Sequence, residues 1–173
     1  MNETIKALLN RRSVRAFKPE QIKDEELLLV LEAGKYAPSG AGHQSALFVA
    51  VQNKETLAKL SKMNAGVAGM AGDPYYGAPT VVLVLADKSK ATPVEDASLA
   101  IGNMFNAAYA LGLGSCWIHR EKEMFESEEG KAFLKEWGVK GDYMGVGACL
   151  LGYPAAGLPK PAPRKENRVV FVK

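Results

Sequence analysis

The sequence has little of what several protein classes require. Only two cysteines occur in 173 residues, Cys116 and Cys149, too few for a disulfide framework, which predicts a reducing, cytoplasmic location. The only histidines are His43 and His119, and their spacing from the cysteines fits no zinc motif, so no metal site is expected. No apolar run reaches the ~18 residues of a membrane-spanning helix. The N-terminus also lacks the basic and apolar regions of a signal peptide.

The common catalytic motifs are missing as well. There is no Gly-x-x-x-x-Gly-Lys-Ser/Thr phosphate loop and no Gly-x-Ser-x-Gly nucleophile elbow. The run Gly112-Leu-Gly114 ends a predicted helix instead of opening one, which excludes a dinucleotide-binding fingerprint. The formal net charge of +3 is too small to indicate a nucleic-acid surface. If the protein is an enzyme, a bound cofactor is expected to supply the reactivity.

What is present indicates one globular domain over residues 1–173, because 47% of the residues are hydrophobic. Apolar periodicity and helix-capping signals predict helices at residues 3–10, 24–36, 54–63, 94–111 and 123–137. Short apolar runs predict strands at residues 46–51, 80–86 and 144–151 and a short strand or turn at 114–118, with a loop at 37–43 and a loop or lid at 64–79. A β-prone segment at residues 168–172 follows a proline-rich connector, and is expected to pair with a distant sheet edge or with another subunit.

A compact basic cluster lies near the start of the chain, within residues 10–17. It contains three arginines and one serine, Arg11, Arg12, Ser13 and Arg15. An arginine side chain keeps its charge when partly buried and offers a planar array of N–H donors, which suits a phosphate group. The cluster therefore predicts a phosphate-bearing ligand, although a solvated surface cluster is the commoner fate of such a run.

Three later segments add to this signal. Residues 37–44 form a turn-rich loop whose small residues let a ligand approach backbone amides. Residues 110–118 place a glycine-rich stretch after a helix, where N–H groups can face a flat heteroaromatic edge. Residues 160–165 carry two cations on a proline-rich connector. Each segment also has an ordinary reading, as a helix-to-strand loop, a helix C-cap and a solvated connector respectively.

The order of these four segments, with Gly152-Tyr-Pro154 between the third and the fourth, resembles the nitroreductase family of FMN-dependent oxidoreductases over nearly the whole chain. That family opens with Arg-Arg-Ser-x-Arg-x-Phe and continues with Ala-Pro-Ser and a following Gln. Its central helix ends in Leu-Gly-Leu-Gly-Ser, and Gly-Tyr-Pro and Pro-Arg-Lys come after it. In this sequence the corresponding motifs are residues 11–17, 37–44, 111–115, 152–154 and 163–165.

The resemblance implies which residues hold FMN. An N-terminal group would grip the phosphate and the pyrimidine edge, with Arg12 beside the ribityl chain, and C-terminal cations would close the phosphate pocket. A loop group would reach the flavin ring from the second subunit, and a group after the central helix would line the ring near its reactive nitrogen. The N-terminal group consists of Arg11, Arg12, Ser13 and Arg15, and the C-terminal cations are Arg164 and Lys165. The loop group consists of Pro38, Ser39, Gly40 and Gln44, and the group after the central helix consists of Gly114, Ser115, Ile118 and His119. No catalytic side chain is implied, because the flavin carries the chemistry.

The resemblance also implies an α+β fold, with a central, mainly antiparallel sheet flanked by helices. The expected assembly is an intertwined homodimer that exchanges its C-terminal strand. The implied activity is a ping-pong transfer of hydride from NADH or NADPH through the flavin to a nitroaromatic, quinone or similar small-molecule acceptor. Neither nucleic acid nor a membrane is expected as a partner.

The sequence departs from the family pattern inside the loop of residues 37–44 and just after it. Gly42 stands where many relatives carry Asn, and Ser45-Ala46 stands where they carry Pro-Trp. The loss of the Asn side chain removes a polar contact to the flavin ring. The alternative is therefore an FMN-binding protein with specialised chemistry, such as flavin fragmentation or dehalogenation, or without general reductase activity. Tyr75 and Tyr76 are expected either to stack on substrate or to pack locally.

Overall fold

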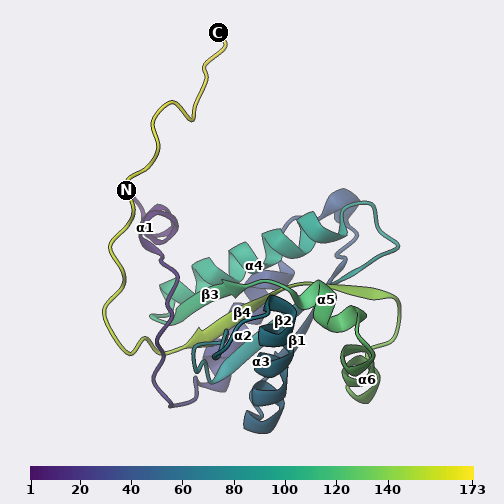
Figure 1. Cartoon of the computed structure of the whole chain (residues 1–173). Coiled ribbons are helices and arrows are strands. Elements are labelled where there is room, and N and C mark those ends of the chain that lie inside the picture. The colour runs from purple at the N-terminus through teal and green to yellow at the C-terminus, as the bar shows by residue number, and fades with distance from the viewer.

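The computed structural model describes residues 1–173 and centres on one four-stranded sheet (Figure 1). Its strands are β1 (Ala46–Val51), β2 (Thr80–Asp87), β3 (Gly114–Ile118) and β4 (Tyr143–Gly152), in the spatial order β1-β2-β4-β3. Every neighbouring pair is antiparallel, which confirms the predicted α+β class. β1 and β3 form the two edges of the sheet; residues 13–14 pair with part of the outer edge of β3, whereas the outer edge of β1 has its backbone groups available to a further partner.

The two central strands, β2 and β4, are buried on both faces. Successive side chains alternate between two cores, so that Val82 and Cys149 face one core while Leu83 and Ala148 face the other. All four are 0% exposed. The continuous apolarity of β2 predicted this two-sided burial, because each face needs its own apolar side chains.

One face of the sheet is covered by α2 (Asp24–Lys35) and α4 (Pro93–Ala110), which contribute to the same core cluster. Figure 1 shows α4 running along this face, with α1 (Glu3–Asn10) beside its C-terminal end. Ile101 and Met104 of α4 are fully buried, because they point from the middle of the helix into the sheet.

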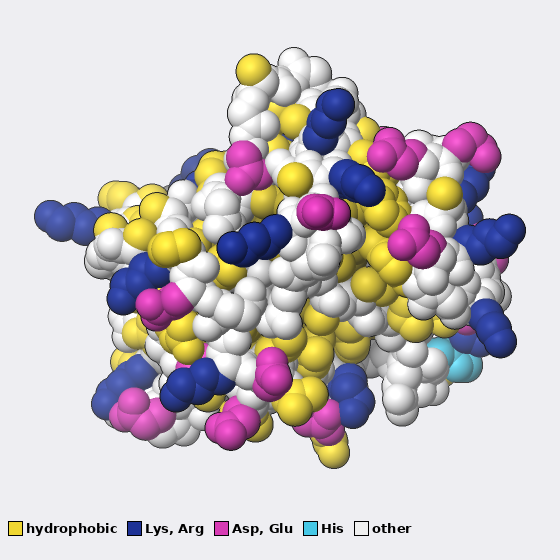
Figure 2. Space-filling model, turned by 90° about the horizontal axis from the view of Figure 1, so that it is seen from below, with side chains coloured by type: hydrophobic (Ala, Val, Ile, Leu, Met, Phe, Trp, Pro, Cys, Tyr) yellow, Lys and Arg dark blue, Asp and Glu magenta, His cyan; other side chains and the backbone are white.

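The opposite face is covered by α3 (Lys54–Ala68), α5 (Glu121–Glu126) and α6 (Glu128–Glu136). None of the helices combines the length and the apolar character that crossing a bilayer requires. Figure 2 shows that basic and acidic side chains are interspersed on the lower face of the molecule, with no region of a single sign.

Two predicted helix boundaries were wrong. α3 continues to Ala68 and ends at Gly69 in the left-handed conformation, so residues 64–68 are helical and not part of a loop. The helix expected at residues 123–137 is two helices, because Ser127 has extended backbone and its hydroxyl accepts a hydrogen bond from the N–H of Gly130 at 3.0 Å. A serine in that position caps a new helix instead of continuing the old one.

Several large apolar residues of α1 and α2 are exposed. In α1 only Ala7 is buried, while Ile5, Leu8 and Leu9 are 41–57% exposed. In α2, Leu28 is 64% exposed and Leu29 is 56% exposed. The apolar side of α1 therefore points away from the core of its own chain, as is typical of a protein–protein contact surface.

The last part of the chain leaves the body of the molecule (Figure 1). It is held at its start, where Phe17 bridges to Pro154 and the N–H of Ala155 donates to the carbonyl of Ala16 at 2.9 Å. Beyond this point the residues up to 173 are exposed and form no helix or strand, so the strand expected at residues 168–172 is absent from the single chain. Its pairing with another subunit stays a prediction, because no second copy is present to supply an edge.

Candidate functional site

The basic cluster lies against the edge strand β3. Ser13 forms a parallel bridge with Ser115, and the N–H of Val14 donates to the carbonyl of Ser115 at 2.9 Å. A Cβ atom at Gly114 would lie 2.9 Å from the Cβ of Val14, so only glycine permits this close approach. Two motifs that are about 100 residues apart in the sequence therefore form one cradle of backbone and arginine side chains.

The arginines of this cradle have no anionic partner in the chain. All five ion pairs of the structure involve lysine, and none involves an arginine. Arg11 lies over the ring of Phe105, 5.5 Å from its centroid, and Arg15 is exposed. The Nη1 atom of Arg12 donates to two backbone carbonyls, whereas its buried Nε atom has no partner. Uncompensated guanidinium groups with free donors favour a bound anion.

Cys116 lies on β3 next to this cluster and is 2% exposed. Burial raises the pKa of its thiol, against the opposing effects of Arg15, Ser13 and Arg11. The protonated thiol is the form that burial favours, which agrees with a structural role and not with that of a nucleophile.

β3 leads into a turn that presents free backbone donors. The N–H groups of His119 and Arg120 donate to no acceptor in the chain. Arg120 has a φ of 86°, a left-handed conformation that is unusual for a residue with a side chain. Four residues of extended strand place His119 ~13 Å from Ser115, so the turn and the arginine cradle lie along one edge of the sheet.

The turn is held from behind by Asn64 of α3, which is 0% exposed. Its Nδ2 atom lies 2.7 Å from the carbonyl oxygen of His119 and 3.3 Å from Oε1 of Glu121. Its Oδ1 atom accepts a hydrogen bond from Nε of Arg120 at 3.1 Å. The buried position of Asn64 on a helix was not predicted, because residues 64–79 lack the apolar period of a helix and were expected to form a loop. Its spacing of four residues from Leu60 could have indicated this position, because residues four apart lie on the same face of a helix and Leu60 is on the buried face of α3.

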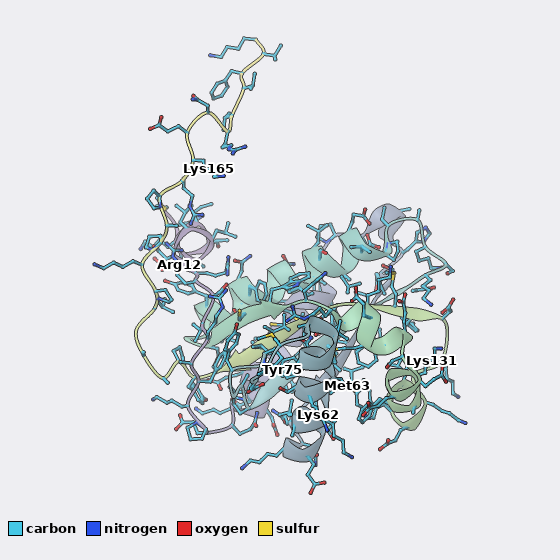
Figure 3. All side chains as sticks on the ribbon, in the orientation of Figure 1. Arg12, Lys62, Met63, Tyr75, Lys131 and Lys165 are labelled. Carbon is cyan, nitrogen blue, oxygen red and sulfur yellow. The ribbon has the colours of Figure 1, made fainter.

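Two further polar groups are buried in the same region. Glu121 is 0% exposed, and burial raises the pKa of its carboxyl group well above the usual value, which favours the neutral form. Burial also raises the pKa of the Tyr75 phenol well above its usual value. Oε2 of Glu121 and the hydroxyl of Tyr75 have no hydrogen-bond partner. Tyr75 is 2% exposed and packs with the core residues of α3 (Figure 3), whereas Tyr76 is 39% exposed.

Replacing Glu121 by glutamine will make the stability of the protein less dependent on pH. Above a pH of ~4.3 the unfolded chain loses a proton from Glu121 that the folded chain keeps, so the wild type loses up to ~1.4 kcal/mol of unfolding free energy per pH unit. This loss continues until the pH reaches the raised pKa of the folded state. Denaturant unfolding at pH 5 and pH 8 measures the effect. The exposed Glu123 on the same helix supplies the control, Glu123→Gln, and equal pH profiles for the two variants would contradict the prediction.

The loop predicted to reach the flavin ring is organised by Asp96, near the N-terminal end of α4. One carboxylate oxygen of Asp96 accepts hydrogen bonds from the N–H of Gly40 and the hydroxyl of Thr92, both at 2.9 Å, and the other accepts one from the hydroxyl of Ser45 at 2.7 Å. The bonds from Ser45 and Gly40 lower the pKa of this carboxyl group. The sequence analysis also missed this role of Asp96, because its partners come from a loop about 50 residues away.

A pocket of about 310 Å³ lies at this loop, and its lining includes Pro38, Ser39 and Gln44. The hydroxyl of Ser39 accepts a hydrogen bond from the N–H of Gln44 at 2.9 Å. Gln44 has a φ of 50° and Gly42 a φ of 69°, so the backbone here takes a conformation that most residues avoid. The polar residue Ser45, which departs from the family pattern, thus has a structural partner in Asp96.

The structure does not bring this loop to the arginine cradle within one chain. The loop lies at the N-terminal end of α4, whereas α1 and the start of β3 lie at its C-terminal end (Figure 1). Asp96, which holds the loop, and Phe105, over whose ring Arg11 lies, are nine residues apart on α4, a rise of ~14 Å, so the two halves of the predicted site do not meet within one chain.

No hydrogen bond or ion pair joins the two C-terminal cations to the cradle. Arg164 and Lys165 lie on the exposed tail, and the structure records no hydrogen bond or ion pair for either side chain. Figure 3 shows Lys165 on the tail beyond the end of α1, with Arg12 labelled at the other end of that short helix. Their part in binding a phosphate group stays a prediction.

Comparison with known proteins supports the resemblance drawn from the motifs. The model of the nitroreductase family matches residues 8–68 and 68–153. The chain is 33% identical over 162 residues to a putative NADH dehydrogenase/NAD(P)H nitroreductase of Archaeoglobus fulgidus, covering 89% of this chain and 87% of that protein.

Two solved structures are similar over the full length of both chains. A nitroreductase with bound FMN from Bacteroides fragilis superposes with a TM-score of 0.90 at 34% identity. A nitroreductase with bound FMN from Desulfitobacterium hafniense superposes with a TM-score of 0.88 at 28% identity. With the family model matching most of the sequence and the fold shared throughout, this chain belongs to the nitroreductase family.

Proposed function

We propose that this protein is an FMN-dependent oxidoreductase that transfers hydride from NADH or NADPH to a small-molecule acceptor such as a nitroaromatic or a quinone. The observation that carries the proposal is the arginine cradle on β3, whose guanidinium groups have no anionic partner in the chain. It lies in a chain whose similar structures from Bacteroides fragilis and Desulfitobacterium hafniense contain FMN.

The residues of the cradle fit this cofactor. The orphaned Nε of Arg12 and the unpaired guanidinium groups of Arg11 and Arg15 supply donors for a phosphate and for a pyrimidine edge. Gly114 allows the backbone to approach closely, and the free N–H groups of His119 and Arg120 can donate to a flat heteroaromatic ring. A bound flavin would accept a hydride and pass it on, which explains why no nucleophile and base pair is needed.

The residues of the chain would have distinct tasks at this site. Arg11, Ser13 and Arg15 would bind and orient the phosphate and the pyrimidine edge, with Arg12 beside the ribityl chain. Backbone N–H groups at the end of β3 would stabilise negative charge that develops on the ring during reduction. The further residues proposed to contact the cofactor are Gly114, Ser115, Ile118, Arg164 and Lys165, together with Pro38, Ser39, Gly40 and Gln44 of a second copy.

A second copy is required because the two halves of the site contact different parts of α4 and do not meet within one chain. In a homodimer, the loop of residues 38–44 from one copy would complete the cradle of the other. The surfaces that support this assembly are the exposed apolar residues of α1 and α2 and the free edge of β1. From residue 155 to residue 168 the extended tail can span up to ~45 Å, enough for its last residues to add a strand to a partner.

The absorbance spectrum of the purified protein tests the proposal. The protein is expected to be yellow, and its flavin band is expected to bleach during anaerobic titration with NADH or NADPH. A colourless protein that takes up no added FMN would refute the proposal. Bound flavin that neither nicotinamide reduces would favour specialised chemistry, in keeping with the absence of a side chain at Gly42.

A further inference from the structure

We propose that Asn64 is a positioning residue that holds the turn of residues 118–121 against the flavin ring and thereby raises the reduction potential of the bound flavin. This inference rests on the proposed function. It concerns a side chain that lies on α3, outside every sequence motif of the site. The residues that carry it are Asn64 and its three partners, His119, Arg120 and Glu121.

One buried amide contacts three consecutive residues, which is the geometry of a clamp. The carbonyl oxygen of His119 can only accept and Nε of Arg120 can only donate, so the orientation of the Asn64 amide is fixed by its partners. Burying an amide inside a helix interface is costly unless its hydrogen bonds are satisfied. Here both ends are satisfied by the turn, so the turn and the amide constrain each other.

The clamp acts where the backbone is strained. Arg120 has a φ of 86°, and a non-glycine residue in such a conformation costs ~1 kcal/mol or more unless its surroundings hold it there. Its own side chain supplies part of that restraint through Nε and Oδ1 of Asn64. This conformation also sets the direction of the Arg120 N–H relative to the turn, and that N–H, like the N–H of the neighbouring His119, has no acceptor in the protein.

Donors fixed in this way have an electrostatic consequence. Preorganised N–H groups stabilise negative charge at a reacting centre better than mobile ones, because they need no reorganisation when that charge forms. Loosening the turn would therefore weaken the binding of reduced flavin more than the binding of oxidised flavin. If the contact between α3 and α5 had only a structural role, removing it would change the stability of the protein without changing the ratio of its affinities for reduced and oxidised flavin.

The test compares Asn64→Leu and Arg120→Lys with the wild type. Asn64→Leu removes every hydrogen bond of the clamp, and Arg120→Lys removes the Nε donor at a partly exposed position where the fold is expected to tolerate it. Asn103→Ala is the matched control, because Asn103 also donates from a helix to a backbone carbonyl, that of Ala33, but away from the turn.

Two readouts are measured on the full-length protein. The first is the midpoint potential of the bound FMN, which is expected to fall by ~30 mV in each test variant, a tenfold change in the ratio of reduced to oxidised affinity. The second, which needs no flavin, is the rate of tryptic cleavage after residue 120, where both arginine and lysine are cut. Release of one hydrogen bond is expected to accelerate this cleavage about tenfold. The control variant is expected to match the wild type in both measurements.

The outcomes separate this inference from the proposed function. If the wild type binds FMN but both test variants keep its potential, the positioning role is wrong while the proposed function stands. An unchanged cleavage rate in both variants would show that Asn64 does not clamp the turn. If the wild type binds no FMN at all, the proposed function fails, and the positioning role fails with it even where cleavage is accelerated.

Discussion

Replacing Arg11 and Arg15 together by alanine will produce a folded protein that no longer retains FMN. Each guanidinium would contribute charge-assisted hydrogen bonds of ~1.5–3 kcal/mol. Loss of both therefore raises the dissociation constant by ~10²- to 10⁴-fold. The fold is expected to persist because neither side chain belongs to a core cluster and neither forms an ion pair. Only the contact of Arg11 with Phe105 is lost, at a cost of ~0.5–1 kcal/mol.

Titration of the apoprotein with FMN, followed by quenching of flavin fluorescence, measures this effect. The matched control is the double variant Lys59→Ala with Lys62→Ala, which removes the same charge from exposed positions on α3 (Lys62 is labelled in Figure 3). The control separates a local grip on the phosphate from a general effect of net charge on an anionic ligand. If the arginine variant keeps the affinity of the wild type, the cradle is not the phosphate site.

Removing the tail after Ala155 will leave a folded monomer that does not bind FMN. Beyond Ala155 the tail contributes nothing to either core cluster, so its loss is not expected to unfold the domain. Val169, Val170, Phe171 and Val172 are 69–95% exposed in the single chain. Burial of each large apolar side chain against a partner would contribute ~1.5–3 kcal/mol, or ~6–12 kcal/mol per tail. A dimer that loses two such tails is expected to dissociate at micromolar concentration, and its incomplete site is expected to release the cofactor.

Sedimentation velocity and flavin content are the two measurements. A less drastic variant, Val170→Asp with Phe171→Asp, is expected to have the same effect because it places two charges in the proposed interface. Its control, Ala156→Asp with Leu158→Asp, makes the same charge change in the connector and is expected to remain dimeric. A truncated protein that stays dimeric with a full complement of FMN would show that the tail has no role in assembly.

Local features of the fold were predictable where one residue type has one physical consequence. The apolar run of β2 predicts burial on both faces of the sheet, and in the structure the side chains of Val81 to Ala86 are 0% exposed. Helix ends were less predictable, because they depend on single contacts. Ser127 ends one helix and caps the next only because its hydroxyl finds the N–H of Gly130. Likewise, Asn64 lies in a helix because α3 continues past Met63 to pack against α5.

The order of motifs in the linear chain was enough to identify the family, the α+β class and the residue types suited to a phosphate and a flavin. The α+β class followed from that family resemblance, whereas the suitability for a phosphate and a flavin depends on local chemistry, namely guanidinium charge and glycine flexibility. Folding in three dimensions was needed to show that residues 11–15 lie against β3, that Asp96 holds the loop of residues 38–45, and that Asn64 holds the turn after β3. These are contacts between segments tens of residues apart, and no local pattern encodes them because each depends on how the helices pack on the sheet.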